Sequence, residues 1–82
     1  MASTLYILQS QSTGRFYIGV SDDVERRIVE HNARQTPSTR GRGPWVLIYT
    51  EDYPTRSEAL RRERQVKAWK SHEAITQLVL QR

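Results

Sequence analysis

The sequence contains no cysteine, which excludes disulfide bonds and thiolate metal sites. It also lacks an apolar run approaching the roughly 20 residues that a membrane-spanning helix needs. The N-terminal stretch "MASTLYILQS" carries no basic segment ahead of its short apolar run, so we expect no secretory signal. These absences together predict a cytoplasmic protein with no membrane partner.

Acidic residues are the minority among the charged ones, with 9 Asp and Glu against 13 Lys and Arg and a net charge of +4. Lysine is scarce as well, because 11 of the 13 basic residues are arginine. The guanidinium group of arginine can donate two hydrogen bonds at once to phosphate oxygens or to the edge of a base, which favours a nucleic-acid partner. An ordinary basic surface explains the net charge equally well. We expect one domain over residues 1–82, with a core so small that each buried polar side chain needs a reason.

The alternation of apolar and turn-forming residues predicts six elements in the order ββαβαα. They are strands over 4–10, 15–20 and 45–53, and helices over about 22–34, 56–69 and 72–81. A turn over 11–14 makes the first two strands a hairpin, and a loop rich in Pro and Gly covers 35–44. Asp22 and Thr55 are the predicted N-caps of the first two helices. The expected fold class is α+β, a small antiparallel sheet with helices packed on it.

Two of these helices turn polar side chains toward the predicted core. On a helical wheel, His31 lies between Val24 and Ile28, and Arg27 lies beside it. Glu63 lies near the middle of the apolar stripe of the next helix. A buried carboxylate without a partner is costly, so Glu63 must be paired, hold a cation or be protonated.

Two interpretations of these polar residues remain open. Glu63 forms a structural ion pair with Arg27 or Lys67, and His31 is a core histidine whose hydrogen bonds are satisfied. Alternatively, the three inward-facing residues line a functional site, which their presence together in so small a domain favours.

The hairpin adds two phenols to this candidate site. Side chains alternate along a strand, so Tyr6 and Tyr17 each lie on the more polar face of their strand. If Tyr6 lies opposite Tyr17, the two phenols stand together, and Gly19 beside them leaves room for a ligand. Ordinary aromatic packing in a sheet is the competing explanation.

The short motifs then form an ordered series. "LYI" at 5–7, "YIG" at 17–19, Arg27 and His31 within "ERRIVEHN", and Glu63 within "SEALRRERQVK" together resemble the GIY-YIG nuclease family. The resemblance covers essentially the whole chain and is greatest to the small stand-alone bacterial branch. It implies a three-stranded antiparallel sheet flanked by helices that hydrolyses phosphodiester bonds with one divalent ion, Mg²⁺ or Mn²⁺.

The resemblance also implies roles for individual residues. The catalytic residues carried over are Tyr6, Tyr17, Arg27, His31 and Glu63. Glu63 is the expected metal ligand, Arg27 contacts the phosphate, and Tyr17 is the first choice to take a proton from the attacking water. Tyr6 orients that water or shares the role of base, and His31 tunes a tyrosine by hydrogen bonding. One departure from the pattern is Leu5, which stands where the name-giving glycine of the family would be.

Further basic residues are expected to contact the nucleic-acid backbone. These are Arg40, Arg42, Arg61, Arg64 and Lys67. Such contacts weaken with salt and carry no sequence information, so we expect weak sequence preference; a solvated helix face is the alternative for these arginines.

The predicted function is a metal-dependent endonuclease acting on DNA, with RNA left open, in DNA repair or processing, and with no small-molecule cofactor. The alternatives are a nucleic-acid-binding module of the same fold with little or no cleavage activity, and a pure interaction domain.

Overall fold

The computed structural model describes residues 2–33 and 43–81, and it confirms the predicted α+β class and the order ββαβαα. The elements are β1 (Ser3–Ser10), β2 (Phe16–Ser21), α1 (Val24–Asn32), β3 (Trp45–Tyr53), α2 (Arg56–Ala68) and α3 (His72–Leu80). The predicted loop over 35–44 lies almost entirely outside the described residues, and with it Arg40 and Arg42.

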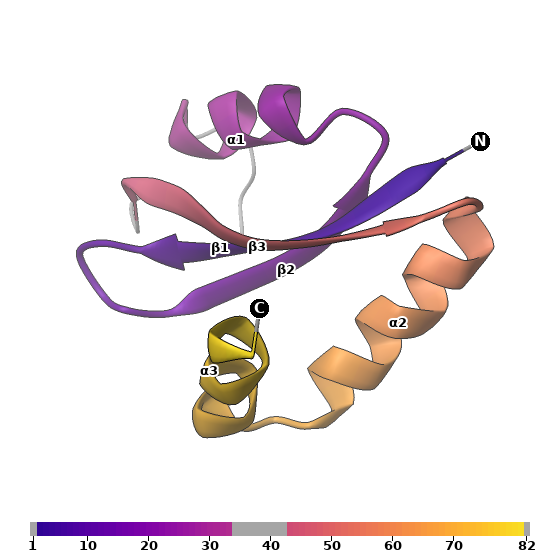
Figure 1. Cartoon of the computed structure of the whole chain (residues 1–82). Coiled ribbons are helices and arrows are strands. Elements are labelled where there is room, and N and C mark those ends of the chain that lie inside the picture. Colours follow the sequence, from indigo (N-terminus) through magenta and orange to yellow (C-terminus); the bar gives the residue numbers. More distant parts are fainter. Residues whose placement is uncertain (1, 34–42, 82) are drawn as a thin grey trace.

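The three strands form one antiparallel sheet in the order β2-β1-β3. Helix α1 covers one face of this sheet, whereas α2 and α3 cover the other (Figure 1). The central strand β1 is therefore buried on both faces, which explains its unbroken apolar run from Leu5 to Leu8. Leu5 and Ile7 pack toward α2 and α3, while Tyr6 and Leu8 pack toward α1.

The helix starts follow from local hydrogen bonding. Thr55 caps α2 as predicted, because its side chain accepts a hydrogen bond from the Glu58 N–H. Helix α1 is capped by Asp23, so the predicted cap at Asp22 is wrong by one residue. The Asp23 N–H donates a hydrogen bond to the hydroxyl of Ser21. This bond fixes a turn that includes Asp22, so the helix begins one residue later than predicted.

A polar cluster joins β3 to α2 on the face away from α1. The Glu51 carboxylate accepts hydrogen bonds from the hydroxyls of Tyr49 and Tyr53 and from Arg62, whose Nε lies 3.0 Å away. Burial raises the pKa of Glu51, but these donors outweigh it and hold the pKa below its usual value. The guanidinium of Arg62 also lies over the ring of Trp69, 5.5 Å from its centroid. Every member of the cluster therefore has a partner, and we interpret it as structural.

The pairing of β1 with β2 differs from the arrangement considered for the two phenols. Tyr6 lies opposite Gly19, and Tyr17 lies opposite Leu8, so the register is shifted by two residues. A Cβ built on Gly19 would be 2.5 Å from the Tyr6 hydroxyl oxygen and 2.6 Å from Cζ of the same ring. The space expected to admit a ligand at Gly19 is therefore filled by the phenol of Tyr6.

This contact predicts the effect of a Cβ at Gly19. Because the Tyr6 ring is buried and cannot move aside freely, Gly19→Ala should destabilise the protein by about 1–3 kcal/mol, measured by chemical denaturation. In a Tyr6→Ala background the same change should be neutral or stabilising, since alanine suits a strand better than glycine. An equal loss in both backgrounds would contradict the proposed steric cause.

Candidate active site

Three rings from three different elements pack together on the α1 side of the sheet. The centroids of Tyr17 and His31 are 4.4 Å apart, and the Tyr6 centroid is 6.2 Å from each of them. The hydroxyl oxygen of Tyr6 lies 3.2 Å from Nε2 of His31. Tyr6 and His31 are each 1% exposed, whereas Tyr17 is half-buried. Tyr17 is thus the ring of this cluster that solvent reaches.

His31 occupies the buried stripe of α1 that the helical wheel predicted. Burial lowers its pKa, and the neighbouring Arg27 guanidinium lowers it further, while Glu30 opposes the shift. The imidazole is therefore neutral near pH 7. A neutral imidazole has one nitrogen that can accept, so Nε2 can take a hydrogen bond from the Tyr6 hydroxyl when Nδ1 carries the ring proton.

The pKa of the Tyr6 hydroxyl is shifted upward, in the opposite direction to the pKa of His31. Burial raises the pKa of Tyr6 most strongly, and the charges of Tyr17 and Glu63 add to the rise. Arg27 opposes them, as a hydrogen-bond donor to the phenol and as a nearby cation. The net shift is upward, so Tyr6 keeps its proton at neutral pH.

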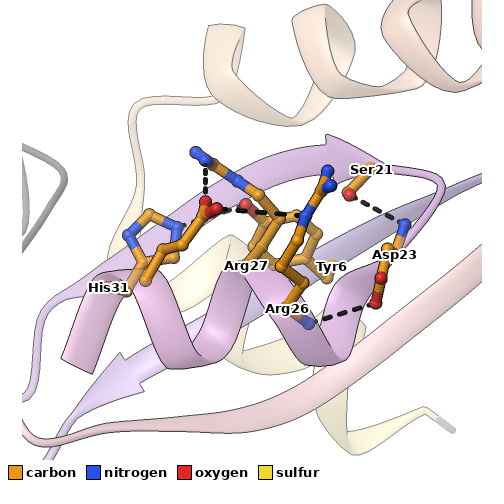
Figure 2. Close-up of polar contacts among 7 residues, drawn as sticks. Tyr6, Ser21, Asp23, Arg26, Arg27 and His31 are labelled. Atoms are coloured by element: carbon orange, nitrogen blue, oxygen red, sulfur yellow. Dashed lines mark hydrogen bonds and ion pairs between the residues drawn. The ribbon is translucent and has the colours of Figure 1, made fainter. Parts of the chain in front are cut away.

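Arg27 lies beside this ring cluster with its side chain 31% exposed (Figure 2). Interaction with Tyr6 is the main reason that the Arg27 pKa is raised, and the guanidinium also forms an ion pair with Glu30 one turn further along α1. Glu30 was not singled out from the sequence, although its spacing of three residues from Arg27 is a common signal for such a pair. Arg27 thus has a fixed position facing both the phenol and solvent.

Glu63 belongs to α2, which packs on the other face of the sheet from α1 (Figure 1). Its side chain is 17% exposed, so it does not lie in the middle of the buried surface as the wheel predicted; Ala59 and Val66 fill that place. Its carboxylate lies 3.3 Å from Nζ of Lys67, which is the ion pair with Lys67 considered from the sequence. Its charge nevertheless raises the pKa of Tyr6, so Glu63 lies within electrostatic reach of the phenol.

The phenol of Tyr6 lies over the edge strand β2 rather than over the middle of the sheet. Because Gly19 has no side chain, the Tyr6 ring extends from the central strand across β2, which is an edge of the sheet. The hydroxyl of Tyr6 therefore lies over β2, near the margin of the sheet. The described structure thus brings Tyr6, Tyr17, Arg27 and His31 together, while Glu63, on the helix layer of the other face, has the smallest of the electrostatic effects on the Tyr6 pKa.

The possible metal ligands are few. Across residues 2–33 and 43–81 there is no group of three or more His, Cys, Asp and Glu side chains that could hold a metal ion. Among the described residues two carboxylates act on the cluster: Glu30, which is paired with Arg27, and Glu63, which is paired with Lys67 and acts on Tyr6 by its charge. That donor set fits an ion such as Mg²⁺, which keeps several waters and often takes only one or two carboxylates from protein.

The remaining candidate residues lie outside the ring cluster itself, on α2 or in the core on the other face of the sheet. Arg61 and Arg64 are exposed on α2, and Lys67 is exposed next to Glu63. Leu5, the departure from the family pattern, is fully buried under the sheet on the α2 and α3 side, away from the phenols. No helix within the described parts of the chain is long and apolar enough to span a membrane.

A pH-dependent stability is expected from His31. Because its pKa is lowered in the folded protein, the unfolded chain binds more protons below about pH 6.5, and the free energy of unfolding should fall as pH is lowered from about 7.5 to about 5.5. The limiting slope for one proton is about 1.4 kcal/mol per pH unit. Denaturation at several pH values should show this fall in the wild type and a flatter profile in His31→Gln.

The matched control is His72→Gln, which changes the exposed histidine. It should keep the pH dependence of the wild type. A profile that flattens for His72→Gln and not for His31→Gln would contradict the proposed role of the buried imidazole.

The chain is similar to known proteins over most of its length. Residues 2–75 match the family model described as the GIY-YIG catalytic domain. A UPF0213 protein of Halobacterium salinarum is 44% identical over 64 residues, which cover 77% of this chain and 82% of that protein. A UPF0213 protein of Staphylococcus saprophyticus is 39% identical over 66 residues, which cover 79% of each chain.

A solved structure is also similar. It is the solution NMR structure of the UPF0213 protein BH0048 from Bacillus halodurans, with a TM-score of 0.65 and 38% sequence identity, covering 100% of this chain and 86% of that chain. The family match spans both phenols, the arginine and histidine of α1 and the glutamate of α2. The chain therefore belongs to the GIY-YIG catalytic domain family.

Proposed function

We propose that this protein is a metal-dependent endonuclease that hydrolyses phosphodiester bonds, with DNA as its substrate and weak sequence preference. Membership of the GIY-YIG family supports nuclease-type chemistry. The observation that carries the proposal is the meeting of two phenols, a neutral imidazole and a guanidinium, with a carboxylate whose charge acts on one of the phenols. Such a combination supplies anion binding, proton transfer and a metal ligand within one small surface.

Arg27 is the group best placed to bind the scissile phosphate. Its guanidinium is partly exposed and is held by Glu30 and Tyr6. A guanidinium donates two parallel hydrogen bonds to phosphate oxygens, and its charge offsets the negative charge that builds up in the transition state. The ion pair with Glu30 keeps the side chain oriented before substrate arrives.

Tyr17 is the proposed proton acceptor for the attacking water. Tyr6 and His31 are too deeply buried to meet a water molecule directly, whereas Tyr17 is half-buried and packs against His31 with the two rings tilted by 58°. A phenol acts as a base at neutral pH only where a nearby cation stabilises its phenolate, so the proposed role requires a positive charge beside the ring. Tyr6 and His31 are positioning residues that fix the Tyr17 ring and the hydroxyl network behind it.

Glu63 is the proposed ligand of one Mg²⁺ or Mn²⁺ ion. Such an ion polarises a phosphate and stabilises the leaving oxygen. Lys67, whose side chain is 55% exposed, pairs with this carboxylate at 3.3 Å, so its ammonium group would have to move aside for the ion. When the ion binds, Lys67 is free to turn toward the nucleic-acid backbone, where Arg61 and Arg64 of the same helix can also contact phosphates.

A cleavage assay tests this function. Nicking of supercoiled plasmid with Mg²⁺ or Mn²⁺ should fall by about 10²-fold or more in Glu63→Ala and Arg27→Ala, since each removes charge stabilisation of the transition state. Tyr17→Phe should also lose at least about 10²-fold through loss of the proton acceptor. Arg56→Ala, which removes an exposed charge at the start of α2, is the matched control and should cut normally.

Wild-type activity in the folded Glu63→Ala and Arg27→Ala variants would reject the proposal. Binding of DNA by a wild type that never cuts it would favour the second candidate, a nucleic-acid-binding module. Leu5 gives that alternative little support, because its side chain packs in the core rather than beside the phenols.

A stability measurement separates the metal-ligand role of Glu63 from a structural one. Partly exposed ion pairs contribute little, so Glu63→Leu should leave the melting temperature unchanged or raise it. Lys67→Met is the matched control for the other half of the pair. A clear drop in the melting temperature for both variants would mean that the ion pair stabilises the fold and would weaken the case for a metal ligand.

A further inference from the structure

A pocket of about 510 Å³ opens where the edge strand β2 meets the turn between α2 and α3. Figure 1 shows α3 lying under the hairpin end of this strand. The residues used here are Arg15, Phe16, Tyr17, Lys67, Lys70 and His72, all of which line the pocket. Tyr17 and Lys67 also belong to the candidate active site, so the two sites share a wall.

The charge of this pocket is of one sign. Arg15, Lys67 and Lys70 contribute three cations, and the residues lining the pocket include no carboxylate. Lys67 is held by Glu63, while Arg15 and Lys70 are exposed. A concave surface of one charge sign attracts an oppositely charged ligand, so the pocket suits an anion.

Lys70 holds an unusual backbone conformation for a lysine. Its φ is 50°, in the left-handed region that favours glycine, at the residue following the C-cap Trp69 of α2. A glycine would end the helix here without strain. The lysine therefore places an ammonium group at the pocket from a strained backbone conformation.

Two rings form the wall beside these cations. The centroids of Phe16 and His72 lie 4.3 Å apart, and both side chains line the pocket. Nucleic-acid bases stack on Phe and His rings with little dependence on sequence. The volume lies within the roughly 300–1,000 Å³ typical of ligand pockets, so both a phosphate and a base can be accommodated.

We propose that this pocket binds the nucleotide adjacent to the scissile phosphate, on a single-stranded segment of the substrate. Its phosphate contacts Arg15 and Lys70, and its base stacks against His72 and Phe16. The strand then runs around the edge of β2, past Tyr17, into the candidate active site. A base in the pocket cannot remain paired, so the substrate has an unpaired nucleotide beside the cut. This inference rests on the proposed function and specifies the substrate class of that site.

The phosphate contacts are tested by binding in the absence of divalent metal. Fluorescence anisotropy of a labelled single-stranded DNA oligomer in EDTA, titrated at several salt concentrations, gives affinity and its salt dependence. Lys70→Gly and Arg15→Gln should each weaken binding and reduce the slope of log K against log salt by about 0.7, the value for one phosphate on a single strand. Arg56→Gln, at the opposite end of α2, should change neither quantity beyond a weak nonspecific effect.

Lys70→Gly also separates binding from folding. Because glycine adopts the left-handed conformation freely, the variant should be at least as stable as the wild type while it binds more weakly. Unchanged affinity in a stable Lys70→Gly, or losses equal to those of Arg56→Gln, would overturn the proposal.

The stacking contact needs a second comparison. His72→Ala should weaken binding of the oligomer by about 5-fold or more, whereas His72→Phe keeps a ring and should retain the affinity. On an oligomer of abasic sugars the two variants should bind equally. Equal binding of the two variants to the normal oligomer would exclude base stacking, and failure of the wild type to bind any single strand would overturn the whole inference.

These outcomes remain distinct from those of the cleavage assay. Weaker binding by the pocket variants, with a wild type that never nicks plasmid, would keep the nucleotide pocket and reject the nuclease function. Glu63-dependent nicking, with pocket variants that bind like the wild type, would keep the nuclease function and reject the pocket.

Discussion

The ring of Tyr6 lies directly over Gly19, and a Cβ at that glycine would be 2.5 Å from the phenol oxygen. This contact lets a side chain from the central strand extend across the edge strand, so its hydroxyl lies at the margin of the sheet. There it meets His31 of α1, and the charge of Glu63 on α2 reaches it as well. The proposed site, which draws on helices of opposite faces, therefore depends on the absence of a side chain at this position of β2. A one-residue slip of the hairpin would turn Tyr6 and Tyr17 to different faces and disperse the site.

The positive charge of Arg27 lowers the pKa of His31 and opposes the rise in the pKa of Tyr6. Its positive charge lowers the pKa of His31, which burial has already lowered, so a second cation does not form beside it. The same charge favours the phenolate of Tyr6 against the larger opposing effect of burial. The described cluster thus holds one persistent positive charge beside the neutral rings of Tyr6 and His31, with Glu30 as its counterion. An anion that displaces Glu30 from Arg27 would find an oriented guanidinium, and this is the arrangement that phosphate binding requires.

Much of the fold could be predicted because the signals are local. Period and turn residues predict the six elements, and the helical wheel places His31 in the buried stripe of α1, where it is 1% exposed. Register is different, because alternation fixes which face Tyr6 and Tyr17 share but not which residues lie opposite, and the turn over 11–14 decides that. The wheel also gives the direction of Glu63 within α2 but not how far the helix sits from the sheet edge. The contact of Glu51 with Arg62 escaped prediction because it depends on the packing of β3 against α2.

The position of Leu5 explains why the chain departs from the family's name-giving glycine without disturbing the phenols. Neighbouring residues on a strand point to opposite faces, so Leu5 and Tyr6 belong to different cores. Complete burial of a leucine contributes about 1.5–3 kcal/mol, which is a large share of the roughly 5–15 kcal/mol that stabilises a typical domain. In a chain of 82 residues the core beneath the sheet has few members, so a side chain at this position matters more than it would in a larger protein. The leucine therefore packs in the core on one face of the sheet, while Tyr6, which follows it, packs beside His31 on the other.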